Sequence, residues 1–133
     1  MHGPNLNLLG KREPEIYGNL NSEDIILNLK TVFPNDTIDY YQSNNESELI
    51  NTIHQSEGIY DGIIFNPGAF SHTSISLADS IKSVATPVIC VHISNIYTRE
   101  EFRHIDFIGE ACKGSIVGLG TQGYTLAIEC LFD

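Results

Sequence analysis

Short apolar runs alternate with amphipathic stretches along this chain, and the alternation predicts strands and helices in turn. Four runs have the length and residue types of strands, and they cover residues 38–42, 62–66, 88–92 and 115–118. The runs at 62–66 and 88–92 are almost continuously apolar, which is typical of strands covered on both faces of a parallel sheet.

Helical periodicity fills much of the sequence between these runs. Asn21 and Asp24 form the capping pattern that begins one helix, and Pro34 ends it. The same pattern at Asn45 and Glu48 begins a second helix. Two further helices are expected at residues 73–84 and 123–131.

Strand and helix alternation of this kind predicts a doubly wound α/β sandwich, in which helices cover both faces of a parallel sheet. We expect a single domain over residues 1–133, because the length is that of one domain and no linker or repeat interrupts it. Ligands in this architecture bind beyond the carboxyl ends of the strands. The polar stretches 66–68 and 92–95 follow two buried runs, and they mark the expected site.

The charge balance argues against nucleic acid as a partner. The chain has 17 acidic and 7 basic residues and a net charge of -10, whereas phosphate backbones are bound by basic stripes. Four of the seven basic residues fall within residues 10–18 and 92–104. Such clustering suits a site for a small anion, and chance placement on the surface explains it equally well.

The apolar runs are all far shorter than the roughly 20 residues of a membrane-spanning helix, so we expect no membrane partner. Cys90, Cys112 and Cys130 are odd in number and lack a C-x-x-C spacing. This argues against a disulfide framework and indicates a reducing compartment, so we expect a cytoplasmic protein. The spacing of histidines, cysteines and carboxylates matches no known ligand set, and we expect no metal.

Residues 10–18 form a loop bracketed by glycines, with two cations and one tyrosine inside it. Glycine at both ends gives the freedom that a lid over a site needs. A nearby guanidinium favours the ionised form of Tyr17, and a phenolate can act as a base. A packed tyrosine bonded to a backbone carbonyl explains the loop as well, and the loop alone favours that simpler interpretation.

His72 and His92 lie near the ends of two different predicted strands. An isolated histidine is more often structural, but two at neighbouring strand ends, with Asn66 and Ser94 close by, favour an active site. None of the lysines lies in a predicted strand, which argues against Schiff-base chemistry. We find no phosphate-binding loop, which argues against a nucleotide site.

Several motifs together resemble the signature of the type II 3-dehydroquinate dehydratase family. In chain order they are GPNLNLLG at 3–10, REP at 12–14, YG at 17–18, NPGA at 66–69, HTS at 72–74, HISN at 92–95, REEFR at 99–103 and GLG at 118–120. The resemblance runs through nearly the whole chain, in order and at family-like spacing. It implies a flavodoxin-like fold, a homododecamer built from trimers, and no cofactor, metal or Schiff base.

The reaction that this resemblance implies is a step of the shikimate pathway. Water is lost from 3-dehydroquinate by anti elimination through an enolate, giving 3-dehydroshikimate. Tyr17 would be the base that removes the proton next to the ketone, with Arg12 favouring its phenolate. Asn5 would hold the water or oxyanion that stabilises the enolate, and His92 would be the acid that protonates the departing hydroxyl.

The resemblance also implies how the substrate is bound. Ile93 and Ser94 would bind its carboxylate, and Asp79 would approach the site of a neighbouring subunit. Asn66, His72 and Arg103 would hold the ring hydroxyls. Arg99 would support the site.

Three positions depart from the family pattern. An apolar strand usually precedes the Gly-Pro-Asn motif, and because the sequence starts at Met1 we expect that strand to be missing here and to lie upstream in a longer chain. His2 stands where asparagine is common, and we expect the loss of a hydrogen bond that shapes the site. Cys90 stands where many members have a glutamate that orients the acid. A neutral thiol cannot do this, so we expect His92 to be less effective.

These departures leave one alternative of a different class. It is a non-catalytic protein of the same fold that binds a carboxylate or serves as a scaffold.

Overall fold

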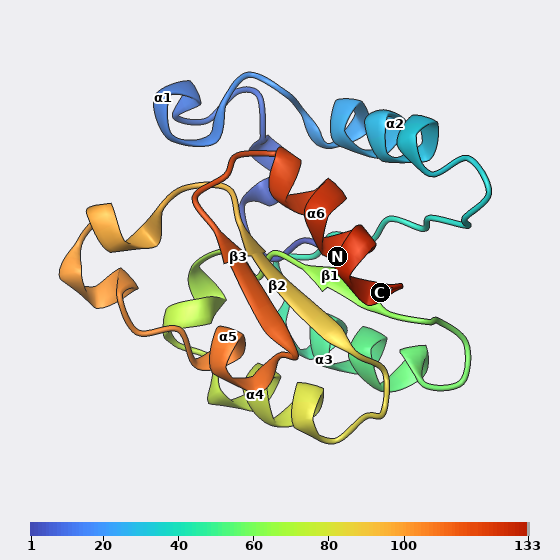
Figure 1. The fold of residues 1–133 in the computed structure, drawn as a ribbon. Helices are drawn as coiled ribbons and strands as arrows, with labels where there is room; N and C mark the ends of the chain where they lie inside the picture. The colour runs from blue at the N-terminus through green and yellow to red at the C-terminus, as the bar shows by residue number, and fades with distance from the viewer. Residues whose placement is uncertain (133) are drawn as a thin grey trace.

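Three parallel strands form the centre of the molecule, and helices lie on both sides of them (Figure 1). The structure is a computed structural model and describes residues 1–132. The strands lie side by side in chain order, as β1 (Ile63–Phe65), β2 (Val88–His92) and β3 (Gly114–Val117). Cys90 on β2 pairs with Phe65 on one side and Ser115 on the other. The predicted doubly wound α/β class is confirmed.

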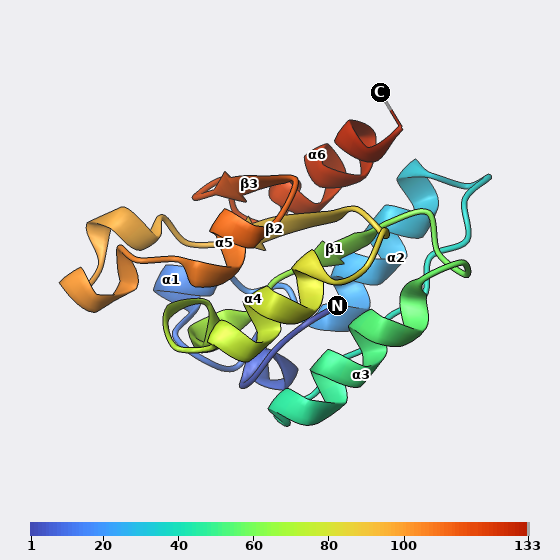
Figure 2. The same cartoon turned by 90° about the horizontal axis from the view of Figure 1, so that it is seen from below.

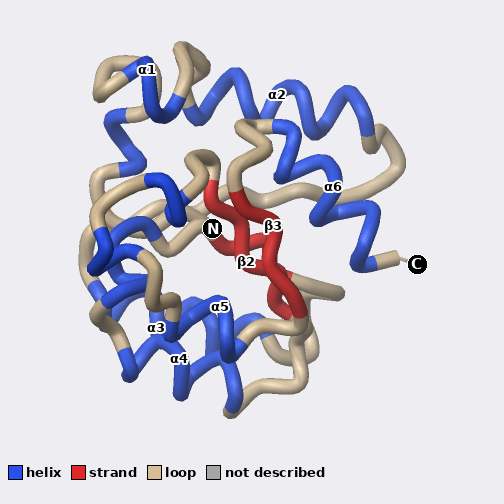
Figure 3. Tube along the Cα trace, turned by 60° about the vertical axis from the view of Figure 1, so that its left-hand side comes forward, coloured by secondary structure: helices blue, strands red, loops and turns tan. Residues whose placement is uncertain are grey.

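The helices form one layer on each face of the sheet, as Figures 2 and 3 show. The first layer contains α2 (Ser22–Val32) and α6 (Gln122–Leu131), and the second contains α3 (Glu46–Ser56), α4 (Ile75–Lys82) and α5 (Phe107–Ala111). Each layer packs its own apolar cluster against the sheet, around Leu29 and Val91 in the first and around Leu49 and Phe65 in the second. All five residues of β2 are therefore buried, as the continuous apolar run predicts.

Polar caps define where the helices begin. Asn21 and Asp24 exchange backbone and side-chain hydrogen bonds in a capping box at α2, and Asn45 caps α3. The third helix does not begin at residue 73 as predicted. Ser74 accepts a hydrogen bond from the N–H of Leu77, so it is the N-cap and α4 begins at the next residue.

Short elements connect the strands to the helices. They are η1 (Leu6–Leu8), α1 (Pro14–Tyr17), η2 (Gly68–His72), η3 (Ile96–Thr98) and η4 (Glu101–Arg103). The sequence pattern predicts neither α1, which lies inside the expected lid loop, nor α5. None of the helices in residues 1–132 has the length and apolar character to cross a bilayer.

The strand predicted at residues 38–42 is wrong. Only Gln42 pairs with a neighbour, through a single parallel bridge to His2, and His2 forms a second bridge to Asn66. A strand requires a partner along its length to satisfy its backbone groups. The partner here is the short segment from Met1 to Gly3, which occupies the position that the resemblance assigns to the preceding strand.

Candidate active site

A pocket at the carboxyl ends of β1 and β2 brings together most of the residues expected from the sequence. Nine of the ten expected catalytic and binding residues line it, namely Asn5, Arg12, Tyr17, Asn66, His72, His92, Ile93, Ser94 and Arg103. Arg99 lines it too. The tenth, Asp79, is exposed on α4 and lies outside this pocket.

Gly3 allows two of the polar loops to meet. A Cβ atom at this position would lie 2.2 Å from the carbonyl oxygen of Pro67, so no other residue fits without a backbone shift. The N–H of Gly3 also donates to the carbonyl of Asn66 at 2.8 Å. This close approach places Asn5 and Asn66 on the same pocket.

Tyr17 contacts two guanidinium groups. The Cζ atom of Arg12 is 5.0 Å from the ring centroid, and that of Arg99 is 5.4 Å from it. Arg99 Nη1 donates to the phenol oxygen at 3.0 Å and to Ser94 Oγ at 3.3 Å. The resemblance assigns stabilisation of the phenolate to Arg12, but the structure places Arg99 on the hydroxyl and Arg12 on the ring face. Both cations therefore contact Tyr17, and Arg99 reaches its hydroxyl directly.

The 10–18 loop closes over the pocket in this structure. The pocket has a volume of about 40 Å³, whereas ligand sites typically measure roughly 300–1,000 Å³. A hollow of about 760 Å³ adjoins it and shares four lining residues with it, namely Tyr17, Ile93, Ser94 and Arg99. Gly10 and Gly18, at the two ends of the loop, have φ angles of +88° and +79°, which suit glycine. Arg12 and Tyr17 of this loop therefore narrow the pocket in this structure.

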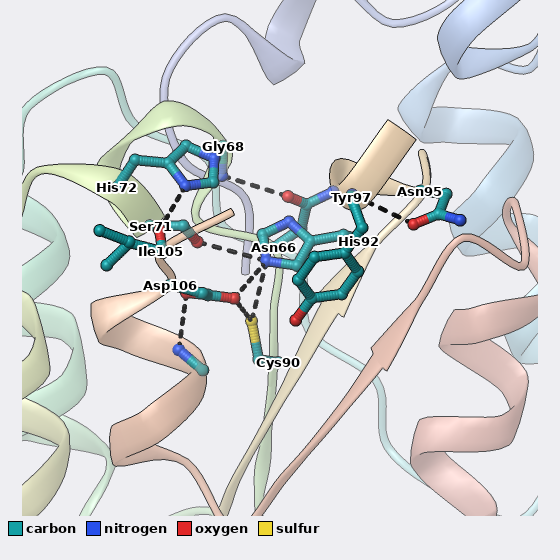
Figure 4. A network of polar contacts seen from close by, with 11 residues as sticks. Asn66, Gly68, Ser71, His72, Cys90, His92, Asn95, Tyr97, Ile105 and Asp106 are labelled. Carbon is teal, nitrogen blue, oxygen red and sulfur yellow. Dashed lines mark hydrogen bonds and ion pairs between the residues drawn. The ribbon is translucent and has the colours of Figure 1, made fainter. Parts of the chain in front are cut away.

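His92 is held by a carboxylate from another element (Figure 4). Its Nε2 atom lies 2.7 Å from Asp106 Oδ2, and the two side chains are 6% and 10% exposed. Burial alone raises the pKa of Asp106, but hydrogen bonds from His92 and from the N–H of Gly109 outweigh it and hold that pKa below its ordinary value. Because Nε2 faces this ionised carboxylate, Nδ1 is the ring atom left to meet a ligand.

Cys90 lies against the same ring nitrogen. Its Sγ atom is 3.5 Å from His92 Nε2 and 3.9 Å from Asp106 Oδ2. Contact with Cys112, followed by burial, raises the pKa of the Cys90 thiol well above its ordinary value. Cys90 is therefore the neutral thiol that the sequence leads us to expect.

Cys90, His92 and Asp106 together offer three possible metal-ligand atoms within 4.8 Å of one another, a grouping that the sequence spacing does not predict. Nitrogen and oxygen ligands of a tetrahedral zinc ion lie about 3.3 Å apart. The separation of 2.7 Å between His92 and Asp106 is instead that of a charge-assisted hydrogen bond. The geometry thus favours a hydrogen-bonded pair over a metal centre.

His72 and Asn66 are oriented by bonds within the protein. His72 Nδ1 donates to the carbonyl of Ile105 at 2.8 Å, which leaves Nε2 as a possible acceptor for a ligand hydroxyl. Burial lowers the pKa of His72, so the ring is neutral at neutral pH. Asn66 Oδ1 accepts from the N–H of Gly68, and its Nδ2 donates to the hydroxyl of Tyr124.

His2 makes two side-chain hydrogen bonds beside the site. The two ring nitrogens of His2 lie 3.0 Å from the hydroxyl of Tyr40 and 2.8 Å from that of Tyr124. Because Tyr124 also accepts from Asn66, His2 supports the site through this network. Burial, with a smaller contribution from the terminal ammonium, lowers the pKa of His2 to about 3.

Replacing His2 with asparagine should make the protein less sensitive to acid. The unfolded chain binds a proton at His2 below about pH 6.5, whereas the folded protein excludes it until about pH 3, so folding stability falls as the pH falls through this window. Between pH 6.5 and 5 the wild type should lose about 2 kcal/mol that His2→Asn does not lose. Urea unfolding at several pH values measures the difference. The exposed His54 on α3 gives the control variant His54→Asn, and equal slopes for wild type and His2→Asn would contradict the prediction.

Comparison with known proteins shows the family to which the chain belongs. Residues 1–132 match the family model described as class II dehydroquinase. The 3-dehydroquinate dehydratase of Anoxybacillus flavithermus is 52% identical over 136 aligned positions, which cover 100% of this chain and 91% of the relative. The Bacillus pumilus protein of the same name is 48% identical, with 98% of this chain and 90% of the relative covered.

Solved structures show the same similarity. The type II dehydroquinase of Butyrivibrio crossotus superimposes with a TM-score of 0.96 and 43% identity, covering 99% of this chain and 94% of the other. The type II dehydroquinase of Propionibacterium acnes has a TM-score of 0.93 and 38% identity, with 99% and 93% covered. These superpositions confirm the expected fold.

Proposed function

This chain belongs to the class II dehydroquinase family and dehydrates 3-dehydroquinate, and from that premise we propose that Tyr17 is its base and His92 its acid. The reaction is that of a hydro-lyase in the shikimate pathway, the route to chorismate and the aromatic amino acids. The phenolate of Tyr17 takes the proton next to the ketone, and the electron pair of the broken C–H bond forms the enolate. The enolate then expels the β-hydroxyl, which takes a proton from His92 and leaves as water.

The proton that Tyr17 gains and the proton that His92 loses balance each other in each turnover. After the elimination Tyr17 is a phenol and His92 is neutral, so one proton must pass from the phenol to the imidazole, through solvent, before the next cycle. Arg99 and Arg12 favour the phenolate, and Asp106 favours the imidazolium. Each partner thus returns its residue to the form that the reaction requires.

The remaining pocket residues bind the substrate and the charge that develops on it. Asn5 holds the water or oxyanion at the enolate, where a preorganised donor typically contributes about 3 kcal/mol. Ile93 and Ser94 bind the substrate carboxylate at the end of β2. Asn66, His72 and Arg103 hold the ring hydroxyls. Three arginines on one pocket favour an anionic substrate in a chain whose net charge is -10.

One observation carries the assignment of the base and the acid. Tyr17, with its two cations, and His92, with its carboxylate, line a single pocket although they come from distant parts of the chain. A cation-stabilised phenol and a carboxylate-paired imidazole on one pocket are the pair of groups that proton abstraction and hydroxyl protonation require. The loop that carries Tyr17 closes the pocket and excludes water from the reaction.

Ultraviolet absorbance tests this function directly, because the product contains a conjugated enone and the substrate does not. Purified protein mixed with 3-dehydroquinate should give a rising enone signal. The signal should survive dialysis against a metal chelator, because we propose that the reaction uses no metal or cofactor. Calorimetric binding of the substrate without any enone would instead support a non-catalytic carboxylate-binding protein and overturn the proposal.

Assembly and location complete the proposal. We expect twelve copies arranged as four trimers in the cytoplasm, with Asp79 of one copy near the pocket of another. Asp79 is exposed on α4, as is the apolar side chain of Ile75 on the same helix, and both suit contact with another copy. Light scattering should give a mass of about 176 kDa, twelve times the 14.7 kDa of one chain, and a monomer mass would contradict this assembly.

A further inference from the structure

We propose that Asp106 is the positioning residue of the general acid, and that it takes the place of a carboxylate on the strand that carries His92. This role rests on the proposed function of His92 as the acid. The strand position two residues before His92 is Cys90, a buried thiol. The carboxylate instead comes from the residue that caps α5, fourteen positions beyond His92 in the sequence.

Asp106 is fixed from both sides. Its Oδ1 atom accepts the N–H of Gly109 at 2.8 Å as the N-cap of α5, and its Oδ2 atom meets His92 Nε2. Ile108, in the same helix, is fully buried in the core beneath the sheet and anchors α5 there. The carboxylate is therefore preorganised by the fold, and it requires no motion to meet the imidazole.

This contact determines which ring nitrogen serves the reaction. A carboxylate only accepts hydrogen bonds, so Nε2 carries a proton in both the neutral and the charged ring. The second proton of the imidazolium is then on Nδ1, which is the one that His92 can donate to the leaving hydroxyl. Asp106 remains ionised throughout, holding the tautomer and stabilising the charge that His92 carries before it acts.

Few other groups face this ring. Ser71 and His72 come from η2, with Ser71 Oγ 3.4 Å from Nε2 and the ring of His72 stacked on that of His92 at 6.3 Å between centroids. Cys90 on β2 is neutral, and Arg103 lies on the same pocket. Asp106 is thus the negative group in direct contact with His92 among the residues that the structure describes.

Asp106→Asn isolates the positioning role. Asparagine can still accept the N–H of Gly109 and cap α5, but its amide presents no negative charge to Nε2. We expect kcat to fall about 100-fold with KM changed less than about threefold, because a positioned acid contributes roughly 100- to 10,000-fold. The exposed carboxylate of the same helix gives the control, and Glu110→Gln should behave as wild type.

Moving the carboxylate provides a sharper test. Asp106→Ser keeps a capping residue at α5 and removes the carboxylate, so kcat should fall as in Asp106→Asn. Adding Cys90→Glu to Asp106→Ser should restore kcat at least tenfold, because the Cys90 side chain already touches Nε2. Cys90→Glu alone should lower kcat, since two carboxylates would then compete for one nitrogen.

Nuclear magnetic resonance of ¹⁵N-labelled histidine separates this proposal from the proposed function. Wild type should show the Nε2-protonated tautomer of His92, and Asp106→Asn should lose that preference. If His92→Asn is inactive but Asp106→Asn keeps the wild-type kcat and the wild-type tautomer of His92, the positioning role is wrong and the acid assignment stands. If wild type produces no enone, the proposed function fails, while the tautomer still reports whether the pair forms. A double variant no more active than folded Asp106→Ser would also overturn the positioning role.

Discussion

Tyr17→Phe should reduce kcat by about 1,000-fold while the substrate still binds. The variant keeps the ring that contacts Arg12 and Arg99 and loses only the hydroxyl that Arg99 contacts at 3.0 Å. Without the phenol, the oxygen that Arg99 still contacts on the pocket is the hydroxyl of Ser94, and an alcohol ionises far less readily than a phenol. The expected loss lies within the roughly 100- to 10,000-fold that one positioned base contributes.

Two measurements separate chemistry from binding in this variant. The enone assay gives kcat, and calorimetry with substrate gives the affinity, which should stay within about threefold of wild type because the proposed carboxylate site at Ile93 and Ser94 is unchanged. Tyr97→Phe is the matched control, because Tyr97 is 57% exposed and does not line the pocket. Undiminished turnover in Tyr17→Phe would remove Tyr17 from the mechanism.

His92→Ala should reduce both activity and stability. Removal of the acid should lower kcat by roughly 100- to 10,000-fold. It also leaves the buried carboxylate of Asp106 without its hydrogen-bond partner His92, and leaving a buried charge without its partner typically costs about 3 kcal/mol. The free energy of unfolding at pH 7 should therefore fall by about that amount, as measured in urea.

The pH dependence of this loss has a defined sign. The lowered pKa of Asp106 in the wild type means that its pairing stabilises the fold above the ordinary carboxyl pKa and that this stability is lost as the pH falls through the lowered value. The stability gap between wild type and His92→Ala should therefore narrow in acid, where Asp106 in the variant is protonated. His92→Asn, which can donate an amide N–H to Asp106, should be inactive but more stable than His92→Ala. An equal loss of stability at pH 7 in both variants would show that the pair contributes little.

The sequence predicts those helices and strands whose formation depends on residues close together in the chain. The cap at Asn21 is visible because its partner lies three residues away, and β2 is visible because a buried strand must be apolar throughout. Residues 38–42 have the composition of a strand, yet they form none, because strand formation depends on a neighbour that sequence composition does not describe. The five residues of α5 are too few for a helical period to show.

Some residues of the candidate site can likewise be grouped from local sequence patterns, whereas other contacts depend on how distant segments pack. The ends of parallel strands meet at one edge of a sheet, so His72 and His92 could be grouped from the strand prediction alone. The contact between Arg99 and Tyr17 joins residues 82 positions apart, and that between His92 and Asp106 depends on where a short helix docks. An aspartate placed before the apolar pair Phe107 and Ile108 is a signal for a helix cap, but nothing in the sequence directs its second oxygen toward an imidazole. Individual roles came from the family resemblance, and spacing alone did not assign them.

The proposed base, Tyr17, lies on the loop at residues 10–18, whereas the proposed acid, His92, lies on the central strand β2. Any movement of that loop would separate the two groups and leave only half of the reactive apparatus in place. A single proteolytic cut between Gly10 and Gly18 would abolish turnover but leave Ile93 and Ser94, the proposed carboxylate site at the end of β2, in place. The cut protein would then bind its ligand without converting it.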